Sequence, residues 1–226
     1  MKILSDHRSC TTCDLCTQAE GVPCNVGIGS RLLSEPQVQN ACHLWYVGRN
    51  PGYHEDVEGN PFVGRSGQLL RGAYIPGINA TDRAQVYLTN GVRCYTVKDE
   101  PPKSRHWKNC LNYLRDELVE RYTDKPTRVG LVLLGGDCTS HVYRNVFGVK
   151  GMNLTKGINE NGATHKVVDT NIDVTLFSTY HPSAVLRDPN YINAVYDHNS
   201  LISDWLDEVM ATPSEPTFVP TRSPNV

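Results

Sequence analysis

A polar loop between apolar and glycine-rich segments is the first group of residues that could do chemistry. It follows the apolar run Leu44–Val47 and carries two polar side chains, Arg49 and Asn50. Pro51 fixes its own φ angle and disfavours a helical conformation at Asn50, and Gly52 can adopt a positive φ. The sequence therefore predicts a strand that ends in a rigid loop, with a polar side chain held at a fixed position.

The cysteines form the second such group, and the chain has 8 of them. Cys10 and Cys13 are separated by two residues, a spacing that lets two thiolates reach one metal centre from a single turn. Cys16 lies one more step of the same spacing away and is a rival ligand to Cys13. Two thiolates do not complete a site, so Cys94 and Cys110 are the candidates for the other pair. In a reducing compartment so many cysteines favour metal ligation over disulfides, although eight purely structural thiols are the alternative.

Two more polar side chains follow strand-like runs. Asn90 ends the run Val86–Asn90, and its amide can both donate and accept hydrogen bonds, as the edge of a pyrimidine requires. His181 lies beside Pro182 at the end of the run Val174–Ser178, where an imidazole can donate to a developing anion. The structural alternatives are a strand-terminal cap for Asn90 and a structural histidine for His181.

The elements that must position these groups can be read from apolar periodicity. Strands are predicted at Leu44–Val47, Val86–Asn90, Val129–Gly135 and Val174–Ser178. Helices are predicted at Ser66–Tyr74, from Ser104 with Trp107, Leu111, Leu114, Leu118 and Tyr122 as its buried face, through Val142 and Phe147, and at Ile192–Met210 with Val195, Ile202, Trp205, Leu206 and Val209 buried. The segments Gly21–Ser34 and Gly148–Gly162 are expected to be loops. Because each candidate residue lies at or just beyond a strand end, we expect an α/β domain with a short open parallel sheet of about four strands, flanked by helices.

The motifs together resemble family 4 of the uracil-DNA glycosylases, the iron–sulfur branch. The resemblance covers about Cys10 to Trp205, and it is carried by Gly48-x-x-Pro51-Gly52, Gly59-x-Pro61-Phe62-Val63-Gly64, Thr89-Asn90 with Cys94, Cys110, and His181-Pro182-Ser183. It implies a uracil-DNA glycosylase-like fold. It also implies hydrolysis of the N-glycosidic bond of uracil, or of a 5-modified uracil, flipped out of DNA during base-excision repair or the processing of modified DNA.

The resemblance also implies a role for most of the candidate residues. Asn50 and His181 would be catalytic: the loop Gly48–Gly52 would position water and stabilise the cationic sugar, and His181 would stabilise negative charge on the departing base. Phe62 would stack on the flipped ring, unless it is a core residue, and Asn90 would read the edge of the base. The segment from Ser183 to Arg187 would be the wedge that enters the DNA where the base leaves.

A [4Fe–4S] cluster is the cofactor that the resemblance implies. Its ligands would be Cys10, Cys13, Cys94 and Cys110, and its role would be structural. Structural zinc is the alternative, because four-cysteine sites bind either metal. The remaining thiols, Cys24, Cys42 and Cys138, are expected in the core or on the surface.

The loop departs from the family 4 pattern at two positions, Arg49 and Asn50, and its Gly52 distinguishes it from another branch. Family 4 typically has G-E-A-P-G, and here Arg49 replaces the glutamate. Asn50 lies where the mismatch-specific and single-strand-selective branches place a water-positioning asparagine. An amide is a poorer base than a carboxylate, so slow turnover is expected. Gly52 stands where the strictly uracil-specific branch has tyrosine, which leaves room for a 5-substituent that Tyr53 could partly refill.

Composition limits the class of protein and of partner. The chain has 226 residues, 39% hydrophobic and 20% charged, with a formal net charge of −2, which argues against a broadly basic surface but allows a local basic groove for DNA. It contains no run of about 18 apolar residues and no signal-peptide core, so we expect a cytoplasmic monomer without a membrane partner. We expect one domain over residues 1–211 and a disordered proline-rich tail over residues 212–226.

Two other functions fit the same residues. The chain could be a catalytically weak DNA-binding module that acts on single-stranded or mispaired DNA without base release, which Arg49 suggests. It could also be an iron–sulfur or zinc accessory subunit of a replication protein that binds its partner through the tail.

Overall fold

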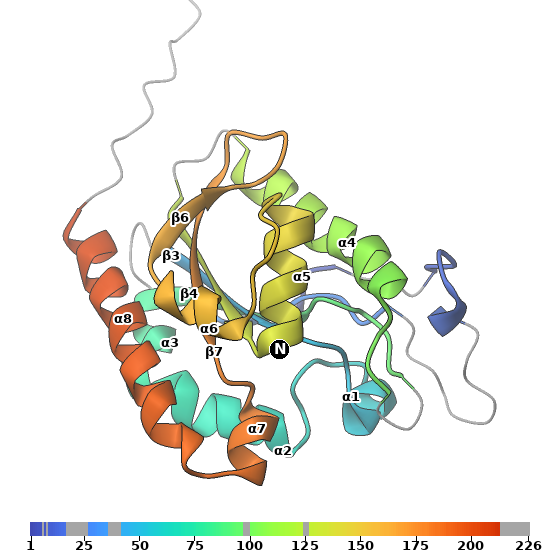
Figure 1. The fold of residues 1–226 in the computed structure, drawn as a ribbon, viewed down its shortest axis with the longest axis horizontal. Coiled ribbons are helices and arrows are strands. Elements are labelled where there is room, and N and C mark those ends of the chain that lie inside the picture. Colours follow the sequence, from blue (N-terminus) through green and yellow to red (C-terminus); the bar gives the residue numbers. More distant parts are fainter. Residues whose placement is uncertain are drawn as a thin grey trace, which may run out of the picture.

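The core of the protein is one twisted sheet of seven strands, in the order β1-β2-β4-β3-β5-β7-β6. The computed structural model describes residues 1–5, 7, 9–16, 27–35, 42–96, 100–123 and 127–212. The strands are β1 (Lys2–Ile3), β2 (Arg31–Ser34), β3 (Cys42–Gly48), β4 (Ala84–Asn90), β5 (Val129–Leu134), β6 (Ala163–Lys166) and β7 (Asp173–Thr179). The four central strands β4, β3, β5 and β7 are parallel, and they are the four that the sequence predicts (Figure 1).

The prediction of about four strands is wrong for the sheet as a whole, because three short antiparallel strands extend it, β1 and β2 on one side and β6 on the other. β1 has two residues, and β6 has the polar sequence Ala-Thr-His-Lys with alternating exposure. Arg31–Ser34 falls in a segment predicted to be a loop. Edge strands are short and polar, so they lack the apolar runs by which central strands are recognised.

The four predicted helices are present, and the structure adds short helices and helical turns that the sequence did not predict. Together they are η1 (Asp14–Cys16), α1 (Tyr53–Glu58), α2 (Arg65–Leu69), η2 (Leu70–Tyr74), η3 (Pro76–Ile78), α3 (Ala80–Arg83), α4 (Ser104–Tyr122), α5 (Gly136–Val146), α6 (Leu154–Asn159), α7 (Pro182–Arg187) and α8 (Tyr191–Ala211). The short helix α6 lies in the predicted loop Gly148–Gly162 and is capped by Asn153, whose Oδ1 accepts from the Lys156 N–H. Lys103, not Ser104, occupies the N-cap position of α4.

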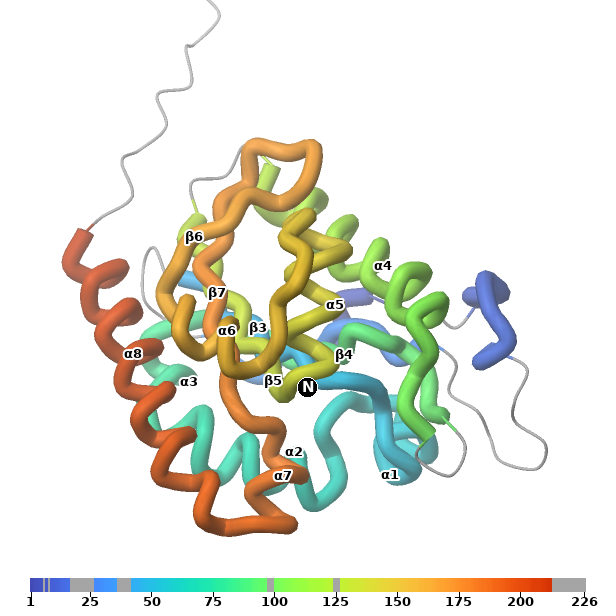
Figure 2. Tube along the Cα trace, in the orientation of Figure 1, coloured from blue at the N-terminus to red at the C-terminus, as the bar shows by residue number. Residues whose placement is uncertain are grey.

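Side chains that alternate along the central strands bury both faces of the sheet. Trp45 and Val47 pack under α4 and α5, whereas Leu44 and Tyr46 pack under η2, α3 and α8. Figure 2 shows α8 along one side of the sheet and α4 and α5 along the other. The predicted buried face of α4 is confirmed at all five positions. Of the five residues predicted to be buried in α8, four are buried and Trp205 is partly buried. The result is a three-layer α/β/α arrangement.

The order of the strands creates a switch point at β3, which pairs with β4 on one side and with β5 on the other. The chain passes from β3 to β4 through α1–α3, and from β4 to β5 through α4 on the opposite face. In an open α/β sheet, ligands bind outside the carboxyl ends of the strands at such a point. The loops after β3, β4, β5 and β7 therefore face the expected site.

The described part of the chain ends just after α8. α8 ends at Ala211, and residues 213–226 lie outside the described residues, so the proline-rich tail and a partner bound through it stay predictions. Among the helices that the structure describes, none has the length and apolarity that a membrane crossing requires.

Candidate active site

The loops after β3 and β4 are locked together at the switch point. Gly48 and Asn90 are paired in register at the ends of their strands. The pairing continues beyond the sheet, because the Gly91 N–H donates to the Gly48 carbonyl over 2.8 Å and the Val92 N–H donates to the Arg49 carbonyl over 2.9 Å. Side chains on the two loops consequently keep fixed relative positions.

The amide of Asn90 and the ring of Phe62 meet over Gly48. A Cβ atom added to Gly48 would lie 2.5 Å from Asn90 Oδ1 and 2.6 Å from Phe62 Cζ. Asn90 and Phe62 are only 3% and 5% exposed. The ring centroids of Phe62 and His181 are 6.4 Å apart. The structure thus brings together an amide, an aromatic face and an imidazole that the sequence places far apart.

The loop that carries Phe62 is held from both sides. Phe62 has a φ of 58°, which is rare for a residue other than glycine and requires support from its surroundings. The buried Arg31 on β2 donates from Nη2 to the Gly59 carbonyl over 2.8 Å, and Arg71 donates from Nη1 to the Phe62 carbonyl. Glu55 accepts from the N–H of Gly64 over 2.8 Å with its Oε1. Arg31 and Arg71 were not singled out from the sequence, whereas Glu55 belongs to the Glu-Asp pair that the family pattern has between its two glycine motifs.

A cavity of about 270 Å³ lies beside this group. It is lined by the ends of β5 and β7, the loop after β3 and helix α7, namely by Arg49, Asn50, Leu134, Gly135, Gly136, Asp137, Leu154, Tyr180, His181, Ser183, Ala184 and Arg187. Five of the predicted site residues are therefore in its wall. Three others, Gly48, Phe62 and Asn90, form the adjoining buried group described above.

His181 is oriented by the residue two positions after it. Its Nδ1 accepts a hydrogen bond from the Ser183 N–H over 3.1 Å and lies 2.8 Å from the Ser183 hydroxyl. Burial, and then the positive charges of Arg49 and Arg187, lowers the pKa of His181 to about 4. The imidazole is neutral at physiological pH, and since Nδ1 is an acceptor, the ring proton is on Nε2.

Asn50 is fixed by three hydrogen bonds. Arg49 donates from Nε to Asn50 Oδ1 over 2.9 Å, and Asn50 donates from Nδ2 to the Pro51 carbonyl over 2.9 Å and to Thr96 Oγ1 over 3.2 Å. The Arg49 guanidinium also lies 3.9 Å from the carboxylate of Asp137. Sequence reasoning missed Thr96 and Asp137, because Thr96 lies in the loop after β4 and Asp137 in the first turn of α5, both far from the loop in sequence.

The remaining predicted positions in the loop, Pro51 and Gly52, are not among the described residues that line the cavity. Pro51 is buried, and Gly52 is the N-cap of α1, where its N–H donates to Glu55 Oε2 over 3.1 Å. Glu55 therefore connects Gly52 with Gly64. Tyr53 is 53% exposed, and its ring contacts that of His54.

Helix α7 lies at the mouth of the cavity. It begins with Pro182, and its exposed residues include Leu186 and Arg187. Figure 1 shows α7 next to α2 and on the same side of the molecule as α1. The Tyr180 that precedes it stacks on Tyr191 with ring centroids 4.4 Å apart. An exposed apolar side chain beside a cation suits a segment that enters DNA.

The predicted ligand cysteines form a neighbouring group of thiols. Cys94 and Cys110 are buried, and Cys10 and Cys13 are partly exposed. Burial, together with the nearby thiols of Cys110, Cys13 and Cys10, raises the pKa of Cys94 to about 12. The pKa of Cys110 is raised by burial and also by Cys13 and Cys10. These four thiols are close enough to repel one another as thiolates, as ligands of one centre must be.

Cys16 is placed differently from the other four. Its thiol donates to the Cys13 carbonyl over 2.8 Å, whereas Cys13 and Cys10 are among the groups that raise the pKa of Cys94 and of Cys110. In the described part of the chain, no three His, Cys, Asp or Glu side chains are already gathered at metal-binding distance. The donor set of Cys10, Cys13, Cys94 and Cys110 nevertheless fits a four-thiolate centre. Cys42 and Cys138 are buried in the core, and Cys24 lies outside the described residues.

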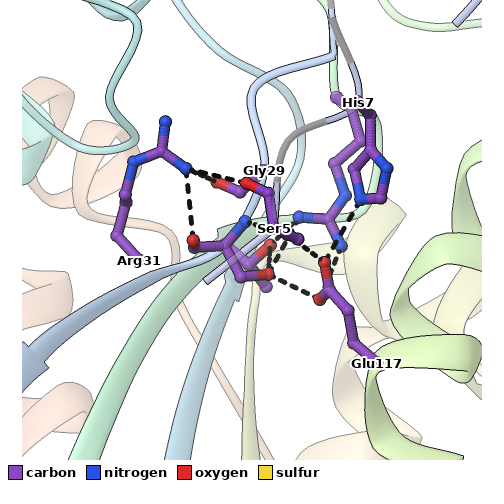
Figure 3. Close-up of polar contacts among 8 residues, drawn as sticks. Ser5, His7, Gly29, Arg31 and Glu117 are labelled. Carbon is purple, nitrogen blue, oxygen red and sulfur yellow. Dashed lines mark hydrogen bonds and ion pairs between the residues drawn. The ribbon is translucent and has the colours of Figure 1, made fainter. Parts of the chain in front are cut away.

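A buried ionic network joins this N-terminal segment to the loop after β4 (Figure 3). Glu117 on α4 accepts from Ser5 over 2.5 Å and from Ser30 over 2.6 Å, and its Oε2 lies 3.0 Å from Arg93 Nη2. Arg93 also donates to the hydroxyl of Thr89, the residue before Asn90. Sequence reasoning missed this network; a glutamate on the apolar face of α4, between Leu114 and Leu118, was the available sign.

The site can be compared with known proteins. Residues 36–200 match the model of the Uracil DNA glycosylase superfamily. The chain is 31% identical over 147 residues to a type-4 uracil-DNA glycosylase of Sulfurisphaera tokodaii, a match that covers 65% of this chain and 62% of that protein. It is 27% and 28% identical over 188 residues to type-4 uracil-DNA glycosylases of Archaeoglobus fulgidus and Thermotoga maritima, with 83% of each chain covered.

Proposed function

Since the chain belongs to the Uracil DNA glycosylase superfamily, we propose that it hydrolyses the N-glycosidic bond of uracil in DNA, as an enzyme of base-excision repair. The resemblance inferred from the motifs is confirmed by this match and by the type-4 relatives. The observation that carries the proposal is the convergence of the Asn90 amide, the Phe62 ring and a neutral His181 beside a cavity at the strand ends.

Recognition takes place on a base turned out of the DNA stack. Extrusion costs a few kcal/mol, and less for a mispaired or single-stranded base, so such DNA is the preferred substrate. Phe62 stacks on the ring, and Asn90 pairs with its edge. Gly48 is required because any side chain there would occupy the space in which these two groups meet.

Bond cleavage separates charge between the base and the sugar. The C1′–N1 bond breaks, and its electron pair leaves with the base as an anion that His181 stabilises by donating from Nε2. Water then adds to the cationic C1′ and loses a proton, so that the products are the free base and an abasic site. Asn50 orients that water by accepting a hydrogen bond from it at Oδ1.

The cluster has a structural part in this scheme. Cys10, Cys13, Cys94 and Cys110 hold a [4Fe–4S] cluster, for which zinc is the alternative metal. When bound, the group joins the N-terminal segment to the loop after β4 and supplies no redox step. Thr89, Arg93 and Glu117 carry the same connection to the strand end that presents Asn90.

Two features of the loop set the rate and the choice of base. Arg49 provides no carboxylate to activate water, so turnover is slower than with a glutamate carboxylate in that position. Gly52 has no side chain, and Tyr53 is largely exposed to solvent, so uracils with a small 5-substituent are also accepted.

The test uses protein purified without oxygen and a labelled oligonucleotide with one uracil, either single-stranded or opposite guanine or adenine. Strand breakage by alkali at that position is expected, with loss in Asn50→Ala and His181→Ala. Asn145→Ala on α5 and His165→Ala on β6 are the matched controls, which should retain activity. Binding to the same DNA without breakage, also after 5-modified uracils are tried, would instead indicate a DNA-binding module without catalysis.

A further inference from the structure

The hydrogen bonds of Asn50 use up its capacity to donate. Its two amide hydrogens have two acceptors, the Pro51 carbonyl at 2.9 Å and the Thr96 hydroxyl at 3.2 Å. Its Oδ1 accepts one hydrogen bond, from Arg49 Nε at 2.9 Å. A carbonyl oxygen has two lone pairs, so one remains. Toward the cavity, Asn50 can therefore act only as an acceptor.

The same bonds fix which way the amide faces. If the amide were turned by half a rotation, its NH₂ group would meet the donor Arg49 Nε, and its oxygen would meet the Pro51 carbonyl. Both contacts would be repulsive. Thr96 does not select between the two orientations, because a hydroxyl can accept from Nδ2 or donate to Oδ1, but its hydrogen bond with Nδ2 anchors the amide in the orientation that Arg49 and Pro51 select.

Thr96 acts from behind the amide and away from the substrate. It is 4% exposed, and it is not among the residues of the described chain that line the cavity, whereas Asn50 is. It lies on the loop after β4, which is bonded to the loop after β3 through Val92 and Arg49. Thr96 is thus a buried hydroxyl on a fixed loop, in contact with the group that orients water.

We propose that Thr96 is a positioning residue for catalysis, which anchors the Asn50 amide so that Oδ1, in the orientation that Arg49 and Pro51 select, is presented to water. This inference rests on the proposed function, because it gives Asn50 the role of orienting the attacking water. It also assigns a structural role to Arg49, which replaces the glutamate of the family pattern. Arg49 bonds to the oxygen of the Asn50 amide, and Thr96 bonds to its nitrogen.

The first test measures single-turnover rates and DNA affinity for the whole protein. Thr96→Val, which keeps the shape but removes the hydroxyl, should lower the rate constant of base release about tenfold, as expected for the loss of one hydrogen bond. The dissociation constant for uracil-containing DNA should change less than twofold. Thr96→Ser should restore the rate, and the matched control Thr175→Val, at a buried threonine on β7, should leave it unchanged.

Two results would overturn the inference while leaving the glycosylase function intact. One is a normal rate in Thr96→Val, and the other is an equal loss in Thr96→Val and Thr96→Ser, which would indicate packing instead of the hydroxyl. Crystal structures provide a readout that is independent of activity. The Asn50 amide should rotate or become split in Thr96→Val and stay fixed in Thr96→Ser, and an unchanged amide in both would refute the proposal even if no base were released.

Discussion

His181 Nδ1 accepts the Ser183 backbone N–H over 3.1 Å, and this one contact determines which proton the imidazole can offer. It places the ring hydrogen of the neutral form on Nε2. Because the donor is a backbone group, no substitution of the Ser183 side chain removes it. The segment His181-Pro182-Ser183 therefore fixes the tautomer of His181. The start of α7 at Pro182 holds this segment in place.

The first prediction concerns the pH dependence of base release. The pKa of His181 is lowered to about 4 by burial and by Arg49 and Arg187, so the neutral form persists well below the ordinary value of 6.5. The rate should stay constant from about pH 8 to about pH 5.5 and fall only as the pH approaches 4. Single-turnover rates at each pH, with circular dichroism to verify folding, would measure this; a fall centred near 6.5 would contradict the account.

The same shift has a consequence for stability. A histidine whose pKa is lower in the folded than in the unfolded state destabilises the fold once the unfolded chain binds the proton, so stability decreases as the pH falls from 6.5 toward 4. Urea unfolding at several pH values should show a smaller decrease for His181→Gln than for the parent protein. Equal decreases in both proteins would show that His181 is not the group responsible.

The second prediction concerns the close approach at Gly48. In Gly48→Ala, the new Cβ would lie 2.5 Å from Asn90 Oδ1 and 2.6 Å from Phe62 Cζ, so one of these groups must move. A displacement of this size at a recognition group should lower kcat/KM about 100-fold. Gly72→Ala is the matched control, because nothing lies within 4 Å of its Cβ. Full activity in Gly48→Ala would refute the recognition role of the group.

The third prediction concerns the buried pair of Arg93 and Glu117. Burial would raise the pKa of Glu117, but Arg93 and the hydrogen bonds from His7, Ser30 and Ser5 outweigh it and lower the pKa to about 2. Removal of one partner leaves a buried charge without compensation, so Glu117→Gln should reduce the free energy of unfolding by about 3 kcal/mol. The exposed Glu120→Gln on the same helix is the control.

The pair also has a defined pH window. Because the carboxyl pKa is depressed in the folded state, its stabilisation is complete above about pH 4.5 and is lost as the pH falls toward 2. Denaturation with urea at descending pH should show this loss in the parent protein and not in Glu117→Gln. An unfolding free energy that is the same in Glu117→Gln and the parent would contradict the prediction.

The fourth prediction concerns the metal centre. Cys94→Ser and Cys110→Ser should lose iron and the visible absorption of the purified protein, because each removes a ligand. Cys16→Ser should keep both, since the Cys16 thiol is bonded to the Cys13 carbonyl. Cys42→Ala, in the core, is the control. Zinc without visible absorption would favour the alternative metal, and loss of iron in Cys16→Ser would overturn the ligand assignment.

Apolar runs were sufficient to predict the central strands and the buried face of α4. Arg31–Ser34 was missed because it has only two apolar residues, and Ala163–Lys166 was missed because a half-exposed edge strand needs few of them. The principal site residues Asn50, Phe62, Asn90 and His181 could be chosen from motifs. Their supports could not, because the contact between Thr96 and Asn50 joins residues that are 46 positions apart.

The most direct test of the central claim identifies the products. Anaerobically purified protein is incubated with DNA that contains one uracil, and mass spectrometry is used to detect the released base and the abasic strand. We predict free uracil and an abasic site in equal amounts, both abolished by Asn50→Ala and His181→Ala and retained in Asn145→Ala and His165→Ala. Release that is unaffected by Asn50→Ala and His181→Ala, or intact DNA with the parent protein for uracil and its 5-modified forms alike, would contradict the account.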